Sequence, residues 1–407
     1  MEKIRHEIMV VGGGASGIMA AIAAKMAGAD VAILEHTDKI GKKLLVTGNG
    51  RCNITNLLQK PEYYRGHNPE KAWDIITHFT EKDTMLFFKE LGLLMKAKGN
   101  YVYPYSNQAY SVVNSLKAAL RRFSIPIYYR TNLIKIEKKT QGFYGVTEKK
   151  HFYAEKVILA TGSKAAEKTG SDGSGYALAK ELGHTIVPVL PALVQVLVME
   201  KEIEGLAGVR MDGSITLYIE DKEKAFEKGE IQFTEYGISG IAVFQVSRFV
   251  SEAWDEGKAI RAELDLCLEM EEGELKSWIE EQQEKENSLL DILTGLVNDK
   301  LARKIALSEE RMADRLVKKI KHFPITILGT KGFADCQVCM GGVPLTEVKG
   351  DTMESLIIDG LYFAGELLDV DGICGGYNLQ WAWSSGWLAG ASAAANAILQ
   401  KGEGRKE

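Results

Sequence analysis

The feature that most constrains this chain is a glycine-rich turn near its start, with the sequence GGGASG at residues 12–17. The turn follows an apolar run at residues 8–11, which is typical of a buried strand, and precedes a run at residues 18–26 that is typical of a helix. A second apolar run at residues 31–34 predicts the next strand. This order of strand, turn, helix and strand is the βαβ unit of a Rossmann-type dinucleotide-binding domain.

Each glycine of the turn has its own physical role. Gly12 permits the tight turn, Gly14 lets the backbone approach a pyrophosphate, and Gly17 lets the helix pack closely on the strand. The N-terminus of the helix supplies free N–H groups and a positive dipole. Glu35 follows the second strand and can accept hydrogen bonds from a ribose with a free 2′-OH, which favours FAD or NAD over NADP.

A second motif, GKKLLVTGNGRCNIT at residues 41–55, combines glycines, paired lysines, Arg, Cys and Asn in one loop. Such a loop can wrap a dinucleotide. We expect Arg51 to reach a phosphate or the adenine, and Asn53 to hydrogen-bond the flavin edge. The alternative is an ordinary turn that Asn and Gly residues stabilise.

Two later motifs each follow an apolar run. Thr161 and Gly162 come after the run VILA, and the motif LYFAGELLDVDG places Glu366 or Asp371 at a strand end, where a carboxylate can bind ribitol hydroxyls. The GGYN motif then predicts the start of a helix, whose first N–H groups would stabilise negative charge on a reduced flavin. That stabilisation favours FAD over NAD.

The middle of the chain predicts a module inserted into the dinucleotide-binding domain. Several β-rich pieces at residues 127–160 predict a small antiparallel meander that ends in a buried strand. The character of the sequence then changes from about residue 191 to residue 333. Within this stretch, alternating or helically spaced apolar residues predict strands and helices at residues 215–219, 262–268, 289–297 and 312–320. The inserted module is therefore part β and part helical.

Composition limits the kinds of partner. The 407 residues include 50 Lys and Arg and 55 Asp and Glu, interspersed to a net charge of −5, so we expect no nucleic-acid partner. We expect no export signal, because no charged segment precedes a cleavable apolar run near the N-terminus, and the Ala-, Gly- and Ser-rich helices predict packing in the protein and no membrane insertion. The five cysteines form no disulfide framework, which suits a cytoplasmic protein. The oligomeric state stays open.

Cysteine and histidine placement predicts no metal site. The seven histidines are scattered and have no Cys or His partner at ligand spacing. Cys336 and Cys339 form a CxxC pair, for which a structural role is favoured over a redox role, because the usual helix-opening context is missing.

With these motifs, the chain resembles a bacterial flavoprotein family that includes aminoacetone oxidase and the flavoprotein reductase of bile-acid 7-dehydroxylation. The resemblance spans nearly the full length and rests on GGGASG with Glu35, and on TGNGRCNITN, FTEYGISG, MGGVPL and GLYFAGELLDVDGICGGYNLQWAWSSG. It implies a split FAD domain of the glutathione-reductase type, an inserted β-barrel-like domain and a small helical domain. The expected bounds of these three parts are residues 1–190 with 334–407, residues 191–268 with 322–333, and residues 269–321.

The expected FAD contacts come from the motifs together with the resemblance. They are Gly12, Gly14, Ala15, Ser16, Gly17, Glu35, Lys43, Gly50, Arg51, Cys52, Asn53, Thr161, Gly162, Gly365, Glu366, Gly376, Asn378 and Leu379. The resemblance also implies that the backbone of Ile134 meets the adenine. One departure concerns the inserted module, where many relatives have His and Pro and this chain has Glu235 and Ile241, so the substrate of a relative does not transfer directly.

Three functions fit these observations. The first is a reductase in which NADH or NADPH transiently reduces FAD, and the flavin reduces a conjugated C=C bond of a small molecule such as a 3-oxo-Δ4 or Δ4,6 steroid or bile acid. Tyr377 and Glu235 are its candidate proton donors. The second is an oxidase of a small amine such as aminoacetone, which produces hydrogen peroxide. The third is an FAD-dependent tRNA-modifying or FAD-sensing protein.

Overall fold

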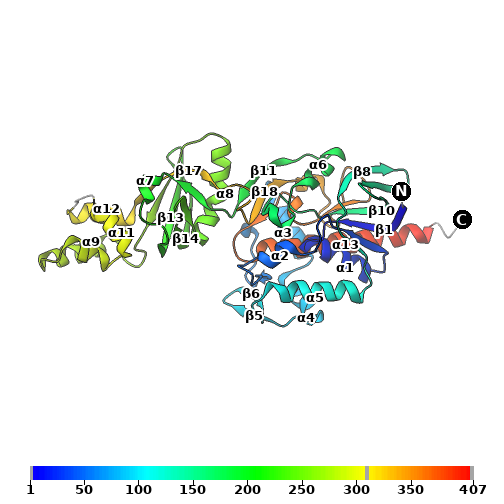
Figure 1. The fold of residues 1–407 in the computed structure, drawn as a ribbon, viewed down its shortest axis with the longest axis horizontal. Coiled ribbons are helices and arrows are strands. Elements are labelled where there is room, and N and C mark those ends of the chain that lie inside the picture. Colours follow the sequence, from blue (N-terminus) through cyan, green and yellow to red (C-terminus); the bar gives the residue numbers. More distant parts are fainter. Residues whose placement is uncertain (1–2, 308–310, 404–407) are drawn as a thin grey trace. The chain divides into compact units, whose positions relative to one another are not determined.

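The computed structural model describes residues 3–307 and 311–403, with side chains described for residues 4–307 and 311–395. Contacts divide the chain into two compact units: Met1–Val189 with Val338–Glu407, called here the first unit, and Leu190–Gln337, called the second unit. Figure 1 shows the elements of each unit along the chain. Each unit has its own apolar core. The further separation of a helical domain at residues 269–321 stays a prediction.

The first unit opens with the predicted βαβ unit. Its elements are β1 (Lys3–Val11), α1 (Ala15–Met26) and β2 (Val31–Leu34), and β1 and β2 pair in parallel. β1 begins five residues earlier than the apolar run predicts, because residues 3–6 pair in parallel with residues 151–154. The apolar pattern therefore predicts the buried half of this strand, residues 8–11, and does not predict the half that backbone pairing holds in place.

A seven-stranded sheet forms the centre of the first unit. Its order is β7-β2-β1-β10-β9-β8, and β19 also pairs with β10. The additional strands are β7 (Ile127–Tyr128), β8 (Leu133–Lys139), β9 (Gly142–Thr147), β10 (His151–Leu159) and β19 (Leu361–Phe363). β9 pairs with the first half of β10 and β19 with its second half.

The meander predicted at residues 127–160 needs one correction. β8, β9 and β10 are antiparallel as expected, but β7 pairs in parallel with β2 at the opposite edge of the sheet. β7 therefore extends the Rossmann sheet. A β-rich sequence pattern predicts that a strand forms and does not show which strand it pairs with.

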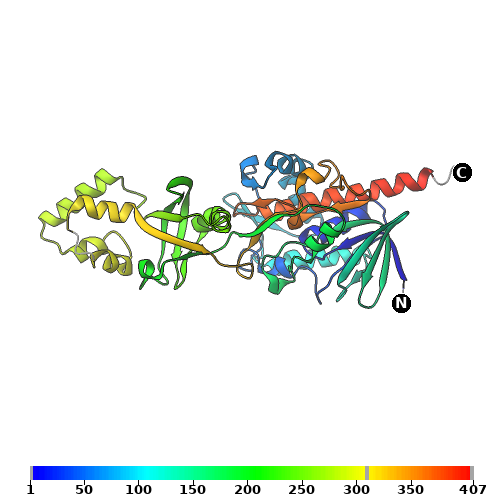
Figure 2. The ribbon, with the colours of Figure 1, turned by 90° about the horizontal axis from the view of Figure 1, so that it is seen from above.

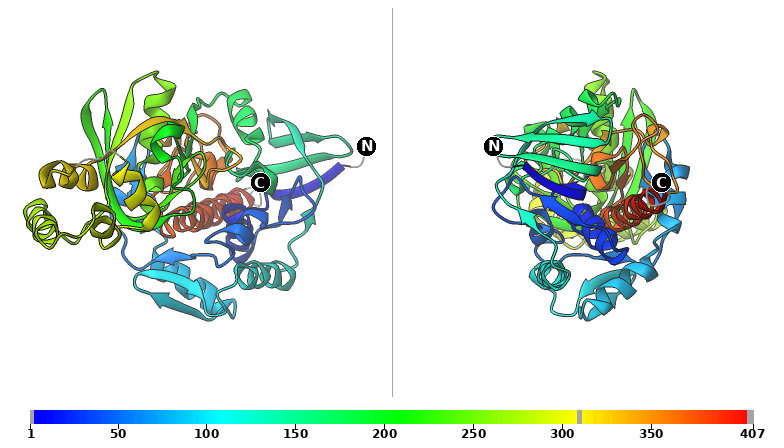
Figure 3. Two further views of the ribbon diagram at one scale, coloured as in Figure 1. Left: turned by 60° about the vertical axis from the view of Figure 1, so that its left-hand side comes forward. Right: turned by 90° about the vertical axis from the view of Figure 1, so that its right-hand side faces the viewer.

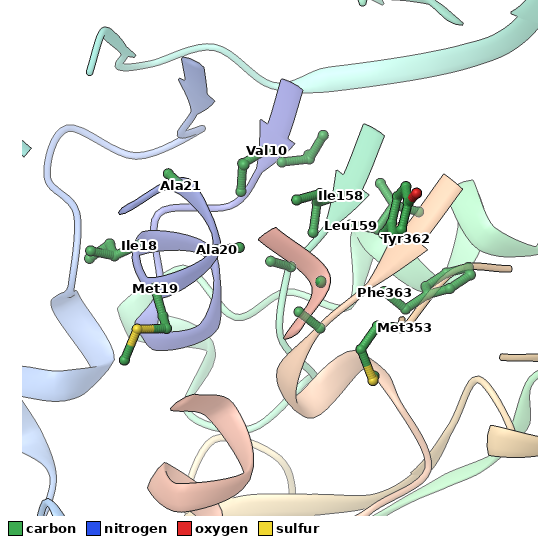
Figure 4. Close-up of a cluster of buried hydrophobic side chains, with 14 of the residues drawn as sticks. Val10, Ile18, Met19, Ala20, Ala21, Ile158, Leu159, Met353, Tyr362 and Phe363 are labelled. Carbon is green, nitrogen blue, oxygen red and sulfur yellow. The ribbon is translucent and has the colours of Figure 1, made fainter. Parts of the chain in front are cut away.

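Two helices pack closely in the core of the first unit. α13 (Tyr377–Glu403) runs beside α1, and small residues allow the approach: a Cβ built on Gly390 would lie 2.1 Å from the carbonyl oxygen of Ala20. Figure 4 shows Ile18, Met19 and Ala20 of α1 in this core, with Val10, Ile158 and Phe363 contributed by the sheet. The long Ala- and Gly-rich run near the C-terminus is thus a packed helix. Within the described residues, no helix is long and apolar enough to cross a membrane.

The remaining elements of the first unit surround this core. A small sheet has the order β3-β6-β5, with β3 (Thr55–Asn56), β5 (Met95–Lys98) and β6 (Tyr101–Pro104). Two further pairs are β4 (Tyr64–Arg65) with β20 (Asp371–Gly372), and β11 (Val187–Ala192) with β18 (Val338–Gly342). The helices are α2 (Lys42–Val46), α3 (Pro69–Thr77), α4 (Glu81–Glu90), α5 (Ala109–Arg122) and α6 (Ser174–Glu181).

The second unit contains a closed six-stranded barrel, which confirms the expected β-barrel-like insertion. Its order is β12-β15-β14-β13-β16-β17, formed by Val196–Val198, Gly237–Ser239, Lys222–Phe233, Arg210–Ile219, Ile260–Asp265 and Phe323–Thr330. The helices of this unit are α7 (Glu200–Ile203), α8 (Ile241–Asp255), α9 (Glu272–Glu284), α10 (Leu289–Thr294), α11 (Asp299–Ala306) and α12 (Ala313–Lys321). Figure 2 shows α9 to α12 together at one end of the barrel strands.

Two predicted elements of the second unit end earlier than expected, and a third begins one residue later. The strand predicted at residues 262–268 ends at Asp265, whose carboxylate accepts the N–H of Cys267 at 2.9 Å and turns the chain out of the sheet. The helix predicted at residues 289–297 ends at Thr294, before Gly295. Met312 is the N-cap of α12 and not part of that helix.

Candidate dinucleotide site

The GGGASG turn leaves an open space at the start of α1. A Cβ on Gly12 would lie 2.4 Å from the oxygen of Ala160, and a Cβ on Gly17 would lie 2.0 Å from the oxygen of Gly12, so close packing requires both glycines. Around Gly14 no atom lies within 4 Å of a built Cβ. Gly14 is the N-cap of α1 and no side chain caps the helix, which leaves its first N–H groups available to an anion.

Glu35 is held rigidly beside this turn. The buried carboxylate accepts the N–H of Gly13 at 2.9 Å through Oε2 and the N–H of Thr37 at 2.7 Å through Oε1. A carboxylate has about four lone-pair sites, so acceptor capacity remains on both oxygens. The carboxylate is thus oriented by the backbone and can still accept hydrogen bonds from the two hydroxyls of a ribose.

The loop at residues 47–53 has an unusual backbone. Gly48, Asn49, Gly50 and Cys52 all have positive φ, between 53° and 79°. The N–H groups of Gly50 and Cys52 donate to the oxygen of Thr47, and that of Arg51 donates to the oxygen of Gly48, so the loop is held by its own backbone hydrogen bonds. Burial raises the pKa of the Cys52 thiol to about 11, so Cys52 packs as a neutral group.

Asn53 and Arg51 leave this loop in different directions. The side-chain oxygen of Asn53 is buried and has no hydrogen-bond partner within the described residues, and it lies 3.0 Å from where a Cβ on Gly376 would be. Arg51 is exposed and donates from Nε to the oxygen of Gly48 at 3.2 Å. Its guanidinium lies over the ring of Tyr103, 5.7 Å from the centroid.

The strand end at residues 363–366 docks onto the glycine turn. A Cβ on Gly365 would lie 2.3 Å from Oγ of Ser16, and Gly365 has a φ of 74°. Glu366 forms an ion pair with Lys43, with 2.7 Å between Oε2 and Nζ, and its other oxygen accepts the N–H of Cys339 at 3.2 Å. Residues far apart in the sequence therefore meet beside the start of α1.

The GGYN motif forms the predicted helix start. α13 begins at Tyr377, and Gly375 and Gly376 both have positive φ. The amide of Asn378 is occupied by the backbone of Gly372, donating to its oxygen at 2.7 Å and accepting its N–H at 2.8 Å. Asn378 thus fixes the turn, while Leu379 packs partly buried against the core.

The residues expected at the adenine side of the site follow β2, β7 and β10 or lie on β8. Thr131 donates its N–H to the oxygen of Glu35 at 3.0 Å, which brings the start of the meander beside the acid. Ile134 lies on β8 with 51% of its surface exposed. The hydroxyl oxygen of Thr161 is buried without a hydrogen-bond partner among the described residues, and Gly162 has a φ of 75°.

The two candidate proton donors lie in different surroundings. Tyr377 is buried between Tyr63 and Tyr64, and its hydroxyl donates to the oxygen of Leu58 at 2.9 Å. Burial raises the pKa of Tyr377 above the usual range for tyrosine, and Tyr63 and Tyr101 add to the effect. Glu235 belongs to the second unit, where it is exposed in the turn between β14 and β15.

A polar cluster beside the GGYN turn was not anticipated from the sequence. Gln380 is fully buried and bonds Thr55, Thr84 and the oxygen of Phe79, while Asn56 donates to the oxygen of Gly375 at 2.9 Å. These bonds lock the helix start to β3. The only signal was the polar residue Gln in NLQWAW, which a helix-core pattern does not explain.

Together these residues form what we call the cradle: residues 12–17, Glu35, residues 47–53, Gly365 and Gly376. The open space at Gly14, the uncapped N-terminus of α1 and the buried oxygens of Asn53 and Thr161, which have no partner among the described residues, fit an elongated ligand with an anionic centre and polar ends. These features suit FAD. Among the described residues, no three His, Cys, Asp or Glu side chains are grouped to hold a metal ion. Cys336 and Cys339 are both buried, and a structural role for this pair stays a prediction.

Comparison with known proteins places this site in a family. The model of the HI0933-like protein Rossmann domain matches residues 6–392. A protein of Clostridium scindens named 3-dehydro-bile acid delta(4,6)-reductase is 44% identical over 96% of this chain and 99% of its own length. Two proteins named ribosomal RNA dihydrouridine synthase are 28% identical over 94% of this chain (Escherichia coli) and 31% over 95% (Haemophilus influenzae), and span 96% and 98% of their own lengths.

Solved structures confirm the fold. The open conformation of a flavocytochrome c3 fumarate reductase matches with a TM-score of 0.54 at 16% identity, over 97% of this chain and 79% of that one. A 3-ketosteroid-delta4-(5alpha)-dehydrogenase from Rhodococcus jostii RHA1 matches with a TM-score of 0.50 at 15% identity, over 97% and 98%. At these identities the likeness concerns the fold alone.

Proposed function

The chain belongs to the HI0933-like Rossmann protein family, and we propose that this flavin-dependent oxidoreductase reduces a C=C bond that is conjugated to a carbonyl group. The observation that carries the proposal is the 44% identity, over almost the whole of both chains, to a reductase named for delta(4,6) unsaturation in a 3-dehydro bile acid. The cradle supports it, because its open turn, fixed acid and helix termini suit FAD.

The names of the relatives describe one type of reaction. In a 3-oxo-Δ4,6 steroid the double bonds are conjugated to the C3 carbonyl, and in uridine the C5=C6 bond is conjugated to the C4 carbonyl. In both cases a hydride adds at the carbon remote from the carbonyl, and a proton adds at a carbon of the resulting enolate. Bound FAD would supply the hydride after reduction by NADH or NADPH, which we propose as the transient donor.

The residues of the first unit have distinct tasks in this proposal. The N-terminus of α1 would bind the pyrophosphate, and Glu35 would accept hydrogen bonds from the adenosine ribose. Asn53 would present its unpaired oxygen to an N–H of the flavin edge. The start of α13 at Tyr377 would stabilise negative charge at the flavin O2 side.

The proton has two candidate sources. The raised pKa of Tyr377 keeps its hydroxyl protonated at neutral pH, and its hydrogen bond to Leu58 would have to break for the proton to reach substrate. Glu235 is exposed. Tyr377→Phe separates these sources, since it removes the hydroxyl and keeps the ring contacts with Tyr63 and Tyr64.

The test is anaerobic. NADH or NADPH is added to the yellow protein, and the flavin absorbance at about 450 nm is followed. We expect bleaching, followed by recovery of absorbance when a 3-oxo-Δ4,6 steroid acid is added, with a product heavier by two hydrogens. Bleaching by aminoacetone, with recovery only in air and release of peroxide, would replace this proposal with the amine oxidase. The three relatives described above are all named for making a reduced product, which ranks the oxidase lower.

A second candidate substrate is a uracil base in RNA. Two relatives named for ribosomal RNA dihydrouridine align over nearly the whole chain, at 28% and 31% identity. The expectation of no nucleic-acid partner, which rested on net charge, therefore needs a direct test. Recovery of flavin absorbance on addition of uridine-containing RNA, with dihydrouridine in the digested product, would favour this candidate.

A further inference from the structure

The charge of the first unit is unevenly distributed along the sequence. No Asp or Glu occurs at residues 39–61 or at residues 91–136, although both stretches contain Lys and Arg. Residues 42–130 hold 14 Lys and Arg against 6 Asp and Glu, in a chain whose net charge is −5. The average over the whole chain therefore hides a basic segment, and basic segments of this kind attract polyanions.

The β5–β6 hairpin places basic and aromatic side chains on one face. Lys96 is directly opposite Tyr103, and Lys98 is directly opposite Tyr101. Because side chains alternate along a strand, these four residues share a face. Val102 is buried on the other face.

The same face continues past the end of β6. Tyr105 is 60% exposed, and Tyr101 is 41% exposed. The ammonium of Lys96 lies over the ring of Tyr105, 5.1 Å from the centroid. We call Lys96, Lys98, Tyr101, Tyr103 and Tyr105 the hairpin face. Among the side chains that the structure describes, at residues 4–307 and 311–395, neither Lys96 nor Lys98 forms an ion pair with a carboxylate.

The hairpin face begins at the turn where we propose the flavin to bind. Tyr101 pairs with Asn56 of β3, whose side chain donates to the oxygen of Gly375. A Cβ on Gly375 would lie 3.1 Å from the ring of Tyr101. Figure 3 shows the blue and cyan segments that carry this hairpin at the edge of the first unit. A strand bound along this face would therefore have one end beside the cradle.

We propose that the hairpin face binds single-stranded RNA, with phosphates on the lysines and bases stacked on the tyrosines. This inference deepens the second candidate function and rests on it for the choice of RNA over another polyanion. The lysines supply charge complementarity, and the exposed rings supply stacking, which is worth roughly 1–3 kcal/mol per base in proteins that bind single strands.

Other occupants fit the hairpin face less well. A steroid acid carries one charge and would leave most of the alternating Lys and Tyr side chains without a partner. A double helix keeps its bases stacked inside, so the exposed rings of Tyr101 and Tyr105 would contact none of them. An acidic peptide would satisfy the lysines and has no bases to stack on the tyrosines.

The experiment measures binding without turnover. Fluorescence anisotropy follows the flavin-loaded full chain as it binds a labelled, uridine-rich single strand of about 12 nucleotides, a length within the site sizes of such proteins. The charge variant is Lys96→Glu with Lys98→Glu. Its matched control is Lys222→Glu with Lys224→Glu, which reverses two exposed lysines at the same spacing on β14 of the second unit. The ring variants are Tyr105→Ala and Tyr105→Phe.

We expect the charge variant to weaken binding at least tenfold and to lower the slope of log K against log salt by about 1.4, the value for two lost phosphate contacts to a single strand. Tyr105→Ala should weaken binding roughly tenfold and Tyr105→Phe should not, because the ring stacks and the hydroxyl does not. Each variant must keep the flavin absorbance of the parent, which shows that the cradle is folded.

Three results would overturn the proposal: equal loss of binding in the Lys222 and Lys224 control, no loss in the Lys96 and Lys98 variant, or equal binding of a duplex of the same sequence. A separate result concerns the second candidate function. If the RNA binds at the hairpin face and leaves the reduced flavin bleached, the face is retained and uracil reduction is rejected, so the two failures are distinguishable.

Discussion

The cradle and the hairpin face are neighbours, but backbone groups form most of the first and side chains form the second. The cradle is made largely by backbone: its glycines leave space, its helix start offers N–H groups, and the carboxylate of Glu35 is fixed by two backbone N–H groups. The hairpin face is made by the ends of lysine and tyrosine side chains on a regular pair of strands. A site made by backbone tolerates few substitutions, whereas a site made by exposed side chains can lose its chemistry and keep its fold.

The largest expected effect comes from adding one carbon to the cradle. In Gly17→Ala the new Cβ would lie 2.0 Å from the oxygen of Gly12, which forces the turn or α1 to move. Such overpacking costs about 1–3 kcal/mol and here also displaces the first N–H groups of α1. We expect purified Gly17→Ala to hold less than about a tenth of the parental flavin, measured by absorbance per mole of protein.

Gly14→Ala is the matched variant for that prediction. The same carbon at this position meets no atom within 4 Å, so the melting temperature of the flavin-free protein should match that of the parent. Flavin affinity should still fall, because the methyl group enters the space proposed for the pyrophosphate. Full flavin content in Gly14→Ala would show that this space is not used by the cofactor.

The next largest effect concerns the fixed acid. Glu35→Gln replaces an acceptor oxygen by a donor that faces the N–H of Gly13 or Thr37, and it removes the charge that strengthens hydrogen bonds to a ribose. A hydrogen bond to a charged group contributes about 1.5–3 kcal/mol, so the dissociation constant for FAD should rise roughly 10- to 100-fold. Titration of the flavin-free protein with FAD measures it, and an unchanged constant would remove Glu35 from the site.

The comparison explains how much was predictable from the sequence. The residue types and spacing of the GGGASG turn and Glu35 are visible in the sequence itself. The βαβ unit was therefore predicted correctly. The hairpin has a glycine in its turn, Gly99 with a φ of 58°, but this turn does not mark the face as a site, and the charge of the face was hidden by an average over 407 residues. Its Lys and Tyr side chains meet only because two strands pair in one register.

Long-range pairing accounts for the other differences. β7 joins β2 because the sheet has a free edge there, and no local pattern at residues 127–128 records that edge. The hydroxyl of Ser16 donates to the oxygen of Ala364, which lies 348 residues later in the sequence and directly precedes Gly365. The LYFAGE motif predicted a strand end near the cofactor, while its contact with the glycine turn required the fold.

A smaller effect is expected for stability at the hairpin face. The charge variant Lys96→Glu with Lys98→Glu alters partly or fully exposed side chains, so the free energy of unfolding should change by no more than about 0.5 kcal/mol. Urea unfolding of the flavin-loaded protein checks this. Loss of flavin in this variant would show that the cradle depends on the side chains of the hairpin face, which contradicts the view that this face can lose its chemistry and leave the cradle intact.

The smallest effect concerns the thiol in the cradle. The pKa of Cys52 is raised to about 11, so its reactive thiolate is scarce at about pH 8 and increases as the pH rises towards that value. We expect iodoacetamide to leave Cys52 unmodified in the native protein at about pH 8 and to modify it after unfolding, as peptide mass mapping would show. Rapid labelling of native protein would mean that the loop at residues 47–53 opens in solution.

The most direct test of the central claim is anaerobic reoxidation of the reduced flavin by a conjugated C=C bond. The protein is reduced chemically with dithionite, so that the outcome does not depend on NADH or NADPH, and a 3-oxo-Δ4,6 steroid acid or a uridine-containing RNA is added. We predict recovery of absorbance at about 450 nm with at least one of these acceptors, and one double bond lost per flavin reoxidised. Recovery with oxygen alone, and with neither acceptor, would contradict the assignment as a C=C reductase.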